Sequence, residues 1–112
     1  MSVYIQTDQV GMLLKKAGLE EGTKSYAYYK YAIELVSQDA ARLEQMIKGV
    51  YYPMSIHFED NISNIEREMR EAITSIYIKG LEQFEDIMKD RADCYPTVSE
   101  VLKILVYLNN LP

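Results

Sequence analysis

Apolar residues between Thr23 and Val50 recur at alternating steps of three and four, and this spacing constrains the fold more than any other feature of the sequence. The series consists of Tyr26, Tyr29, Ile33, Val36, Ala40, Leu43, Ile47 and Val50. An α-helix has about 3.6 residues per turn, so these steps place the side chains on one stripe. The pattern predicts a long amphipathic helix over residues 23–50, capped by Thr23 or Ser25 and with Gly49 in its last turn.

A second long segment begins near Ser55 or Asp60 and runs to about Asp93. Its apolar stripe consists of Phe58, Ile62, Ile65, Met69, Ala72 and Ile76. Pro53 separates the two segments, because a proline has no amide proton and disfavours helix in the residue before it. We therefore expect the chain to reverse at Pro53 and the two long helices to pack as an antiparallel hairpin.

The two ends of the chain carry signals for shorter helices. Thr7 or Asp8 can cap a helix that Gly18 closes. Near the other end, Thr97 and Glu100 have the spacing of a capping box, in which each residue bonds the backbone of the other. The sequence thus predicts an all-α protein with the order short, long, long, short helix.

The length of 112 residues predicts one domain, residues 1–112. The long helices would span roughly 40 to 50 Å and each terminal helix only about 15 to 20 Å, so part of the seam would stay bare in a monomer. We therefore expect a two-fold dimer to complete the bundle. The residues expected in the core or at the self-association seam are Tyr29, Ile33, Val36, Leu43, Ile47, Ile62, Ile65, Met69 and Ile76.

Charge, hydrophobicity and cysteine content exclude or disfavour several classes of function. The net charge of −5 and the scattered Lys and Arg residues argue against direct nucleic-acid binding, which draws on clustered basic side chains. No apolar run approaches the roughly 18 residues that a membrane span needs. Cys94 is the only cysteine, which excludes an internal disulfide and fits a reducing cytoplasm.

Few residues have the chemistry of an active or metal site. His57 is the only histidine and could share a metal with Asp60, but a surface histidine is the simpler interpretation. A nucleophilic Cys94 would need a nearby base that the sequence does not place. We predict no catalytic residue, no cofactor and no metal site.

Two surfaces are candidates for binding another protein. The first is rich in tyrosine, a residue that gives large contact area at small entropic cost. The second is an acidic stripe, which could attract a basic partner or imitate nucleic acid. Ordinary packing explains the tyrosine cluster equally well, and a solvated helix face is the simpler explanation of the acidic stripe. The tyrosines are Tyr28, Tyr31, Tyr51 and Tyr52, and the acidic residues are Glu82, Glu85, Asp86 and Asp90.

The leading hypothesis is a non-enzymatic, homodimeric protein-interaction module in the cytoplasm, with another protein as its partner and no contact to nucleic acid or membrane. One alternative is an inhibitor encoded by a virus or mobile element, which would occlude a nucleic-acid-binding protein through the acidic stripe. Another alternative is a ligand-binding or metal-binding helical bundle.

Overall fold

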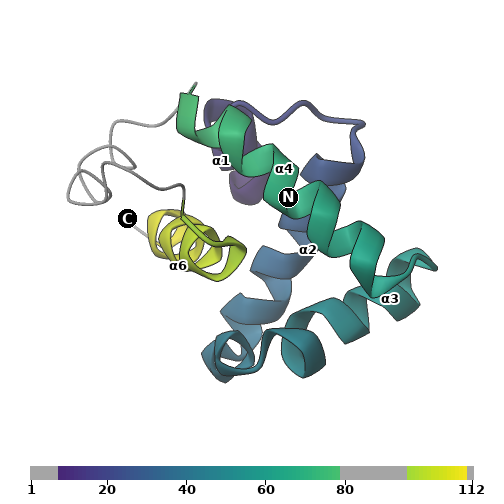
Figure 1. Ribbon diagram of the computed structural model, residues 1–112. Helices are drawn as coiled ribbons and strands as arrows, with labels where there is room; N and C mark the ends of the chain where they lie inside the picture. Colours follow the sequence, from purple (N-terminus) through teal and green to yellow (C-terminus); the bar gives the residue numbers. More distant parts are fainter. Residues whose placement is uncertain (1–7, 79–95, 111–112) are drawn as a thin grey trace, which may run out of the picture.

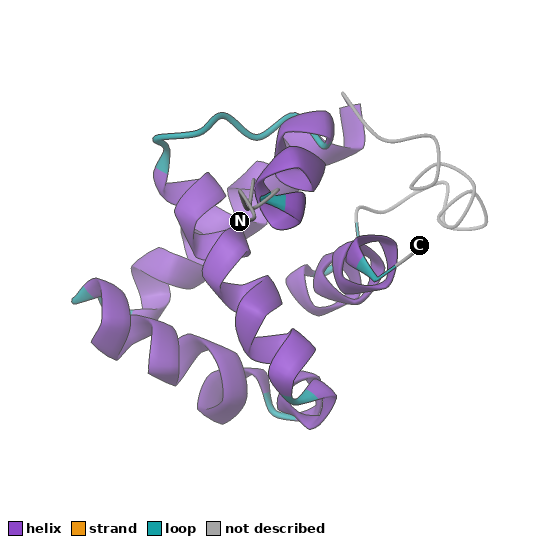
Figure 2. Cartoon of the chain, turned by 180° about the vertical axis from the view of Figure 1, so that it is seen from behind, coloured by secondary structure: helices purple, strands orange, loops and turns teal. Residues whose placement is uncertain are grey.

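The computed structural model describes residues 8–78 and 96–110, with the side chains of residues 77 and 78 excepted. Every regular element in these ranges is helical, which confirms the predicted all-α class for this part of the chain (Figure 2). None of these helices is long and apolar enough to cross a membrane. The elements are α1 (Gln9–Lys16), α2 (Lys24–Gln38), the 3₁₀ helix η1 (Ala40–Glu44), the π-helix η2 (Ile47–Tyr51), α3 (Tyr52–Phe58), α4 (Ile62–Ile78) and α6 (Val98–Asn109).

Local capping signals confirm where three helices begin. The Asp8 carboxylate accepts a hydrogen bond from the Gly11 N–H and starts α1, and Gly18 follows this helix with a φ of 95°. Thr23 caps α2 through the Tyr26 N–H. Both hydrogen bonds of the predicted capping box between Thr97 and Glu100 are present at the start of α6.

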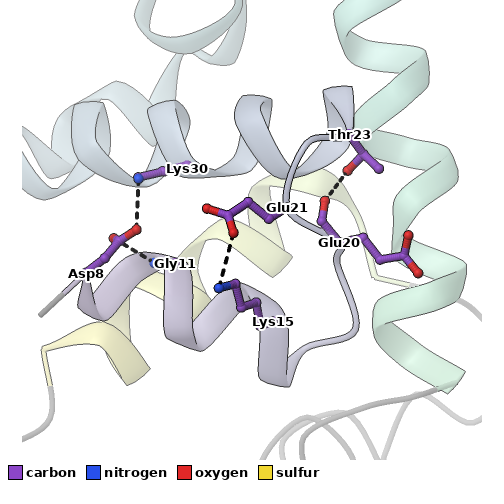
Figure 3. Close-up of polar contacts among 7 residues, drawn as sticks. All are labelled: Asp8, Gly11, Lys15, Glu20, Glu21, Thr23 and Lys30. Carbon is purple, nitrogen blue, oxygen red and sulfur yellow. Dashed lines mark hydrogen bonds and ion pairs between the residues drawn. The ribbon is translucent and has the colours of Figure 1, made fainter.

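Polar contacts also fasten α1 to α2 and to the loop between them, as Figure 3 shows. The Lys30 ammonium lies 2.9 Å from Asp8 Oδ2, and the Lys15 ammonium lies 3.3 Å from a carboxylate oxygen of Glu21. The hydrogen bond from the Gly11 N–H, followed by that from Lys30, lowers the pKa of Asp8. Each of these exposed pairs contributes little to stability, and they mainly fix the orientation of α1.

The predicted single helix over residues 23–50 is wrong. α2 ends at Gln38 because Asp39 is extended, with φ −154° and ψ 98°, and its carboxylate accepts a hydrogen bond from the Ala41 N–H at 3.1 Å. Asp39 therefore caps a new 3₁₀ turn in place of continuing the helix. Ile47, expected in the seam, is 66% exposed as a result.

Gly49 has a different role from the one expected. A Cβ at this position would lie 2.6 Å from the carbonyl oxygen of Arg42, so only glycine allows η1 and η2 to approach so closely. The Arg42 guanidinium also donates a hydrogen bond of 2.8 Å to the Gly49 carbonyl oxygen. Gly49 thus lets the backbone fold over itself and does not end a long helix.

Pro53 does not mark the reversal either. It lies in the first turn of α3, which follows η2 without a break, so the chain stays helical through the proline. The chain turns at residues 59–61, between α3 and α4. The described part of the second predicted helix therefore begins at Ile62, and its continuation from residue 79 to Asp93 lies outside the described residues.

α2 is at the centre of the core and contacts α1, α4 and α6 (Figures 1 and 2). α4 crosses α2 in both views, so an antiparallel pair of two long helices is not confirmed. Of the expected seam residues, Leu43 and Ile62 are only partly buried, whereas the others apart from Ile47 are buried. The buried ones are Tyr29, Ile33, Val36, Ile65, Met69 and Ile76.

α6 and α1 cover the apolar faces that the hairpin would have left bare. Leu102 and Leu105 of α6 and Leu14 of α1 are fully buried in the same cluster. The bare seam was the reason to expect a dimer, and this reason does not hold for the described part of the chain. Dimerisation itself stays a prediction.

Candidate functional site

α3 and α4 are consecutive helices joined by a three-residue turn, which lies at the right of Figure 1. α3 ends at Phe58, and Glu59 adopts the left-handed conformation with φ 53° and ψ 44°. The N–H groups of Glu59 and Asp60 both donate to the Ser55 carbonyl oxygen and close the end of α3. Two helices joined by so short a turn have the connectivity of a helix-turn-helix.

The turn is held by hydrogen bonds from two adjacent side chains. Asn61 Oδ1 accepts from the Asn64 N–H at 2.8 Å and so caps α4. Asp60 Oδ1 accepts from the Asn61 N–H at 2.8 Å and from Asn64 Nδ2 at 3.1 Å. Tyr28 of α2 donates to the other carboxylate oxygen, Asp60 Oδ2, at 2.6 Å. The start of α4 is therefore fixed both to its own turn and to the central helix.

Burial and these hydrogen bonds shift the pKa values of the groups involved. The hydrogen bond from Tyr28, followed by that from Asn64, lowers the pKa of Asp60, so this carboxylate is ionised at neutral pH. Burial, together with the hydrogen bond to Asp60, raises the pKa of Tyr28 to about 12. The neutral tyrosine thus remains a donor to the ionised carboxylate over the whole physiological range.

A second tyrosine of α2, Tyr29, forms a hydrogen bond to the backbone near the middle of α4. The hydroxyl of Tyr29 donates to the carbonyl oxygen of Met69 at 2.7 Å, in the buried interior. Burial raises the pKa of Tyr29. Because α4 is tied at its start and near its middle, its orientation relative to the core is well defined.

The two faces of α4 differ in character. Ile65, Met69, Ile73 and Ile76 are buried, whereas the outer face is polar. Arg70 pairs with Glu66, and Arg67 lies 4.0 Å from Glu71. Side chains of the Asn, Ser and Arg types can hydrogen-bond to base edges and to phosphates. The exposed or partly exposed polar residues of this helix are Ser63, Asn64, Glu66, Arg67, Glu68, Arg70, Glu71, Thr74 and Ser75.

The four tyrosines expected to form a binding surface do not lie on one exposed face. Tyr28 and Tyr51 are buried, and Tyr51 lines a cavity of about 700 Å³ together with Glu66 and Arg70. Tyr31 is partly buried and stacks on the ring of His57, with 4.1 Å between the ring centroids. Only Tyr52, 56% exposed, is open to solvent.

Of the other candidates from the sequence, the acidic stripe and Cys94 lie outside the described residues, and His57 belongs to no group of described side chains that could hold a metal ion. The acidic stripe outside the described residues includes Glu82, Glu85, Asp86 and Asp90. His57 contacts Tyr31 and Phe58. Within residues 8–78 and 96–110, no three His, Cys, Asp or Glu side chains are grouped so that they could hold a metal ion.

The sequence interpretation missed this site because it merged α3, the turn and α4. It placed the start of one long helix at Ser55 or Asp60 and considered only the apolar stripe of that helix. The signal was the Asp60-Asn61 dipeptide before Ile62, since both residue types favour turns and helix N-caps.

Residues 10–108 match the model of a known protein family, described as the sporulation initiation factor Spo0A C terminal. A comparison with curated protein sequences gives no match. The family is that of a DNA-binding domain of a transcription factor, which contradicts the prediction of a protein-interaction module or viral inhibitor without direct nucleic-acid contact. That prediction relied on net charge, which sums over the whole surface, whereas base recognition depends on a few side chains on one helix.

Proposed function

Because the chain belongs to the Spo0A C-terminal family, we propose that it binds DNA through a helix-turn-helix formed by α3 and α4. The observation that carries this proposal is the turn at residues 59–61, anchored to α2 by Tyr28 and followed by a helix with a polar outer face. In such motifs the second helix lies in the major groove and the first helix crosses the DNA backbone. α4 would therefore be the recognition helix.

The order of residues along α4 supports this role. The N-terminal residues of a recognition helix contact the base edges. Here Ser63, Asn64 and Arg67 occupy the first two turns of α4, and Arg70 follows one turn later. Arginine can make a bidentate contact to guanine and asparagine one to adenine, so the residue types on this face fit direct readout.

The charges on α4 predict how the binding depends on salt. Arg67 and Arg70 are the basic residues of α4, and each pairs with a glutamate of the same helix. Each neutralised phosphate contributes about −0.9 to the slope of log K against log salt, so two arginine contacts give a slope of about −2. Affinity for unrelated DNA should be correspondingly weak, and sequence-dependent contacts should provide much of the binding free energy.

The same proposal covers the remaining properties of the chain. We place residues 1–112 in one non-enzymatic domain, because α1, α2, α4 and α6 contribute to one apolar cluster. We place the protein in the cytoplasm, because its single cysteine fits a reducing compartment and DNA is its proposed ligand.

The test is to select duplexes from a randomised DNA library with the full chain and to measure their affinity by fluorescence anisotropy at several salt concentrations. Arg67→Ala and Arg70→Ala should each weaken binding, roughly 5- to 150-fold if the arginine contacts a base. If it contacts a phosphate instead, the salt slope should fall by about 0.9.

Lys103→Ala is the matched control, because Lys103 is an exposed basic residue on α6, outside the helix-turn-helix. It should leave the affinity within about twofold, since exposed substitutions away from a site have small effects. Circular dichroism shows whether each variant is folded. Failure to enrich any duplex, or equal effects of all three substitutions, would contradict the proposal.

A further inference from the structure

The side chain of Asn64 has a defined orientation, although it lies at the surface end of α4. Its Nδ2 lies 3.1 Å from Asp60 Oδ1. A carboxylate only accepts hydrogen bonds, and the pKa of Asp60 is lowered, so the amide nitrogen and not the amide oxygen faces Asp60. This leaves Asn64 with one N–H and its Oδ1 free of hydrogen bonds to the described residues.

Asp60 is itself held by the protein through both carboxylate oxygens. Tyr28 donates to Oδ2 at 2.6 Å, and the Asn61 N–H donates to Oδ1 at 2.8 Å. The ring of Tyr28 is buried and lies edge-on to the ring of Phe58, with 4.8 Å between the centroids. A chain of hydrogen bonds therefore connects the core of the protein to the amide of Asn64.

From this geometry, and resting on the proposed function, we infer that Asn64 reads an adenine in the major groove and that Asp60, held by Tyr28, positions its amide. Adenine presents an acceptor, N7, beside a donor, the N6 amino group. The free N–H of Asn64 would donate to N7, and Oδ1 would accept from N6. Both of these groups are available only in the orientation that the bond to Asp60 imposes.

The charge of Asp60 distinguishes this reading from a phosphate contact. Asp60 lies within hydrogen-bond distance of Asn64 and is ionised, so a phosphate at the same place would meet a like charge. A base edge has no net charge and avoids this repulsion. Asn64 should therefore contribute to sequence preference and not to general affinity for DNA.

The experiment is selection from a randomised duplex library with the full chain, followed by sequencing of the enriched duplexes. The unsubstituted protein should prefer adenine at one position of the enriched motif. Asn64→Ala should lose this preference by roughly 5- to 150-fold, and leave the other positions unchanged. Tyr28→Phe and Asp60→Asn should relax the preference at the same position.

Tyr31→Phe is the matched control, because Tyr31 is on the same helix as Tyr28 but its hydroxyl bonds to none of the described residues. It should leave the motif unchanged. The double variant Tyr28→Phe/Asn64→Ala should equal Asn64→Ala alone at the adenine position, because Tyr28 acts through Asn64. Thermal unfolding shows how much of each variant is folded.

The outcomes separate this inference from the proposed function. If the unsubstituted chain enriches no duplex, both are overturned. If it enriches a motif that Asn64→Ala leaves unchanged, only the role of Asn64 is overturned. A loss of affinity that is equal for all sequences would assign Asn64 to a phosphate contact or to folding, and would also overturn it.

Discussion

The chain interrupts its apolar periodicity twice, after α2 and after α3, and the two interruptions are built differently. After α2, the 3₁₀ and π turns of residues 40–51 fold over one another, and Gly49 meets the backbone of Arg42. After α3, residues 59–61 are shaped by hydrogen bonds from Asp60 and Asn61. The first break combines the Asp39 cap with the close backbone contact at Gly49, whereas hydrogen bonds from polar side chains specify the second.

This difference separates two ways of fixing a backbone. Where two backbone segments are in direct contact, a Cβ atom added to one of them must push the other away. A network of hydrogen bonds distributes the same task over several groups, and each group contributes about 1 kcal/mol. The first break should therefore be the more sensitive to one substitution, whereas the second should control orientation at the proposed DNA-binding surface.

Gly49→Ala should produce the largest effect. The added methyl group would lie 2.6 Å from the Arg42 carbonyl oxygen, so the free energy of unfolding should fall by about 1 to 3 kcal/mol, despite the higher helix propensity of alanine. Urea denaturation followed by circular dichroism measures the change. Lys48→Ala, at an exposed neighbouring position, should change stability by less than about 0.5 kcal/mol. A stability equal to that of the unsubstituted protein would mean that the segment is not closely packed.

Asn61→Ala should come next, because it removes the cap of α4 while leaving its apolar face intact. Loss of the hydrogen bond to the Asn64 N–H should lower the free energy of unfolding by about 1 kcal/mol. Asn61→Asp keeps a capping oxygen and should retain most of the stability. Equal losses for the two substitutions in urea denaturation would show that the cap does not specify the second break.

Alkaline pH should give the smallest effect and compares one tyrosine from each region. The pKa values of Tyr28, bonded to Asp60, and of Tyr51, in η2, are both raised from 10 to about 12. Folding thus favours the neutral hydroxyl, so the stability that each group provides is present below pH 10 and is lost as the pH rises toward 12.

Between pH 9 and 10.5, Tyr28→Phe and Tyr51→Phe should each reduce this alkaline loss by less than about 1 kcal/mol. Only Tyr28→Phe should also lower stability at pH 7, because it removes the hydrogen bond to Asp60. Denaturation curves at the three pH values measure both effects. A similar cost of the two substitutions at pH 7 would remove the distinction between the regions.

Helix starts were predictable from the sequence, whereas the lengths of the helices were not. Asp8, Thr23 and Thr97 each cap a backbone N–H three residues later, so the local sequence is enough to predict these helix starts. The heptad spacing after Thr23 carries less information, because Ala40 and Ile47 continue the steps of three and four and are nevertheless exposed. Asp39 was the local signal for the end of α2, and its capping role appears only when α2 stops there.

The candidate site was less predictable still. Tyr28 and Asp60 are 32 residues apart in the sequence, and only the packing of α2 beside the turn between α3 and α4 brings them together. The apolar spacing of α4 places Asn64 and Arg67 outside the buried stripe and gives no information on what they contact. Their proposed role follows from the turn that precedes them and from α2, which holds that turn.

Glu59 has a consequence for how this corner of the molecule could change. It holds φ 53° without being glycine, at a cost of roughly 1 kcal/mol relative to a residue that has no Cβ. A glycine here would relieve the strain and at the same time remove one negative charge beside the proposed recognition helix. Glu59→Gly should therefore increase both the thermal stability of the fold and the electrostatic attraction to DNA.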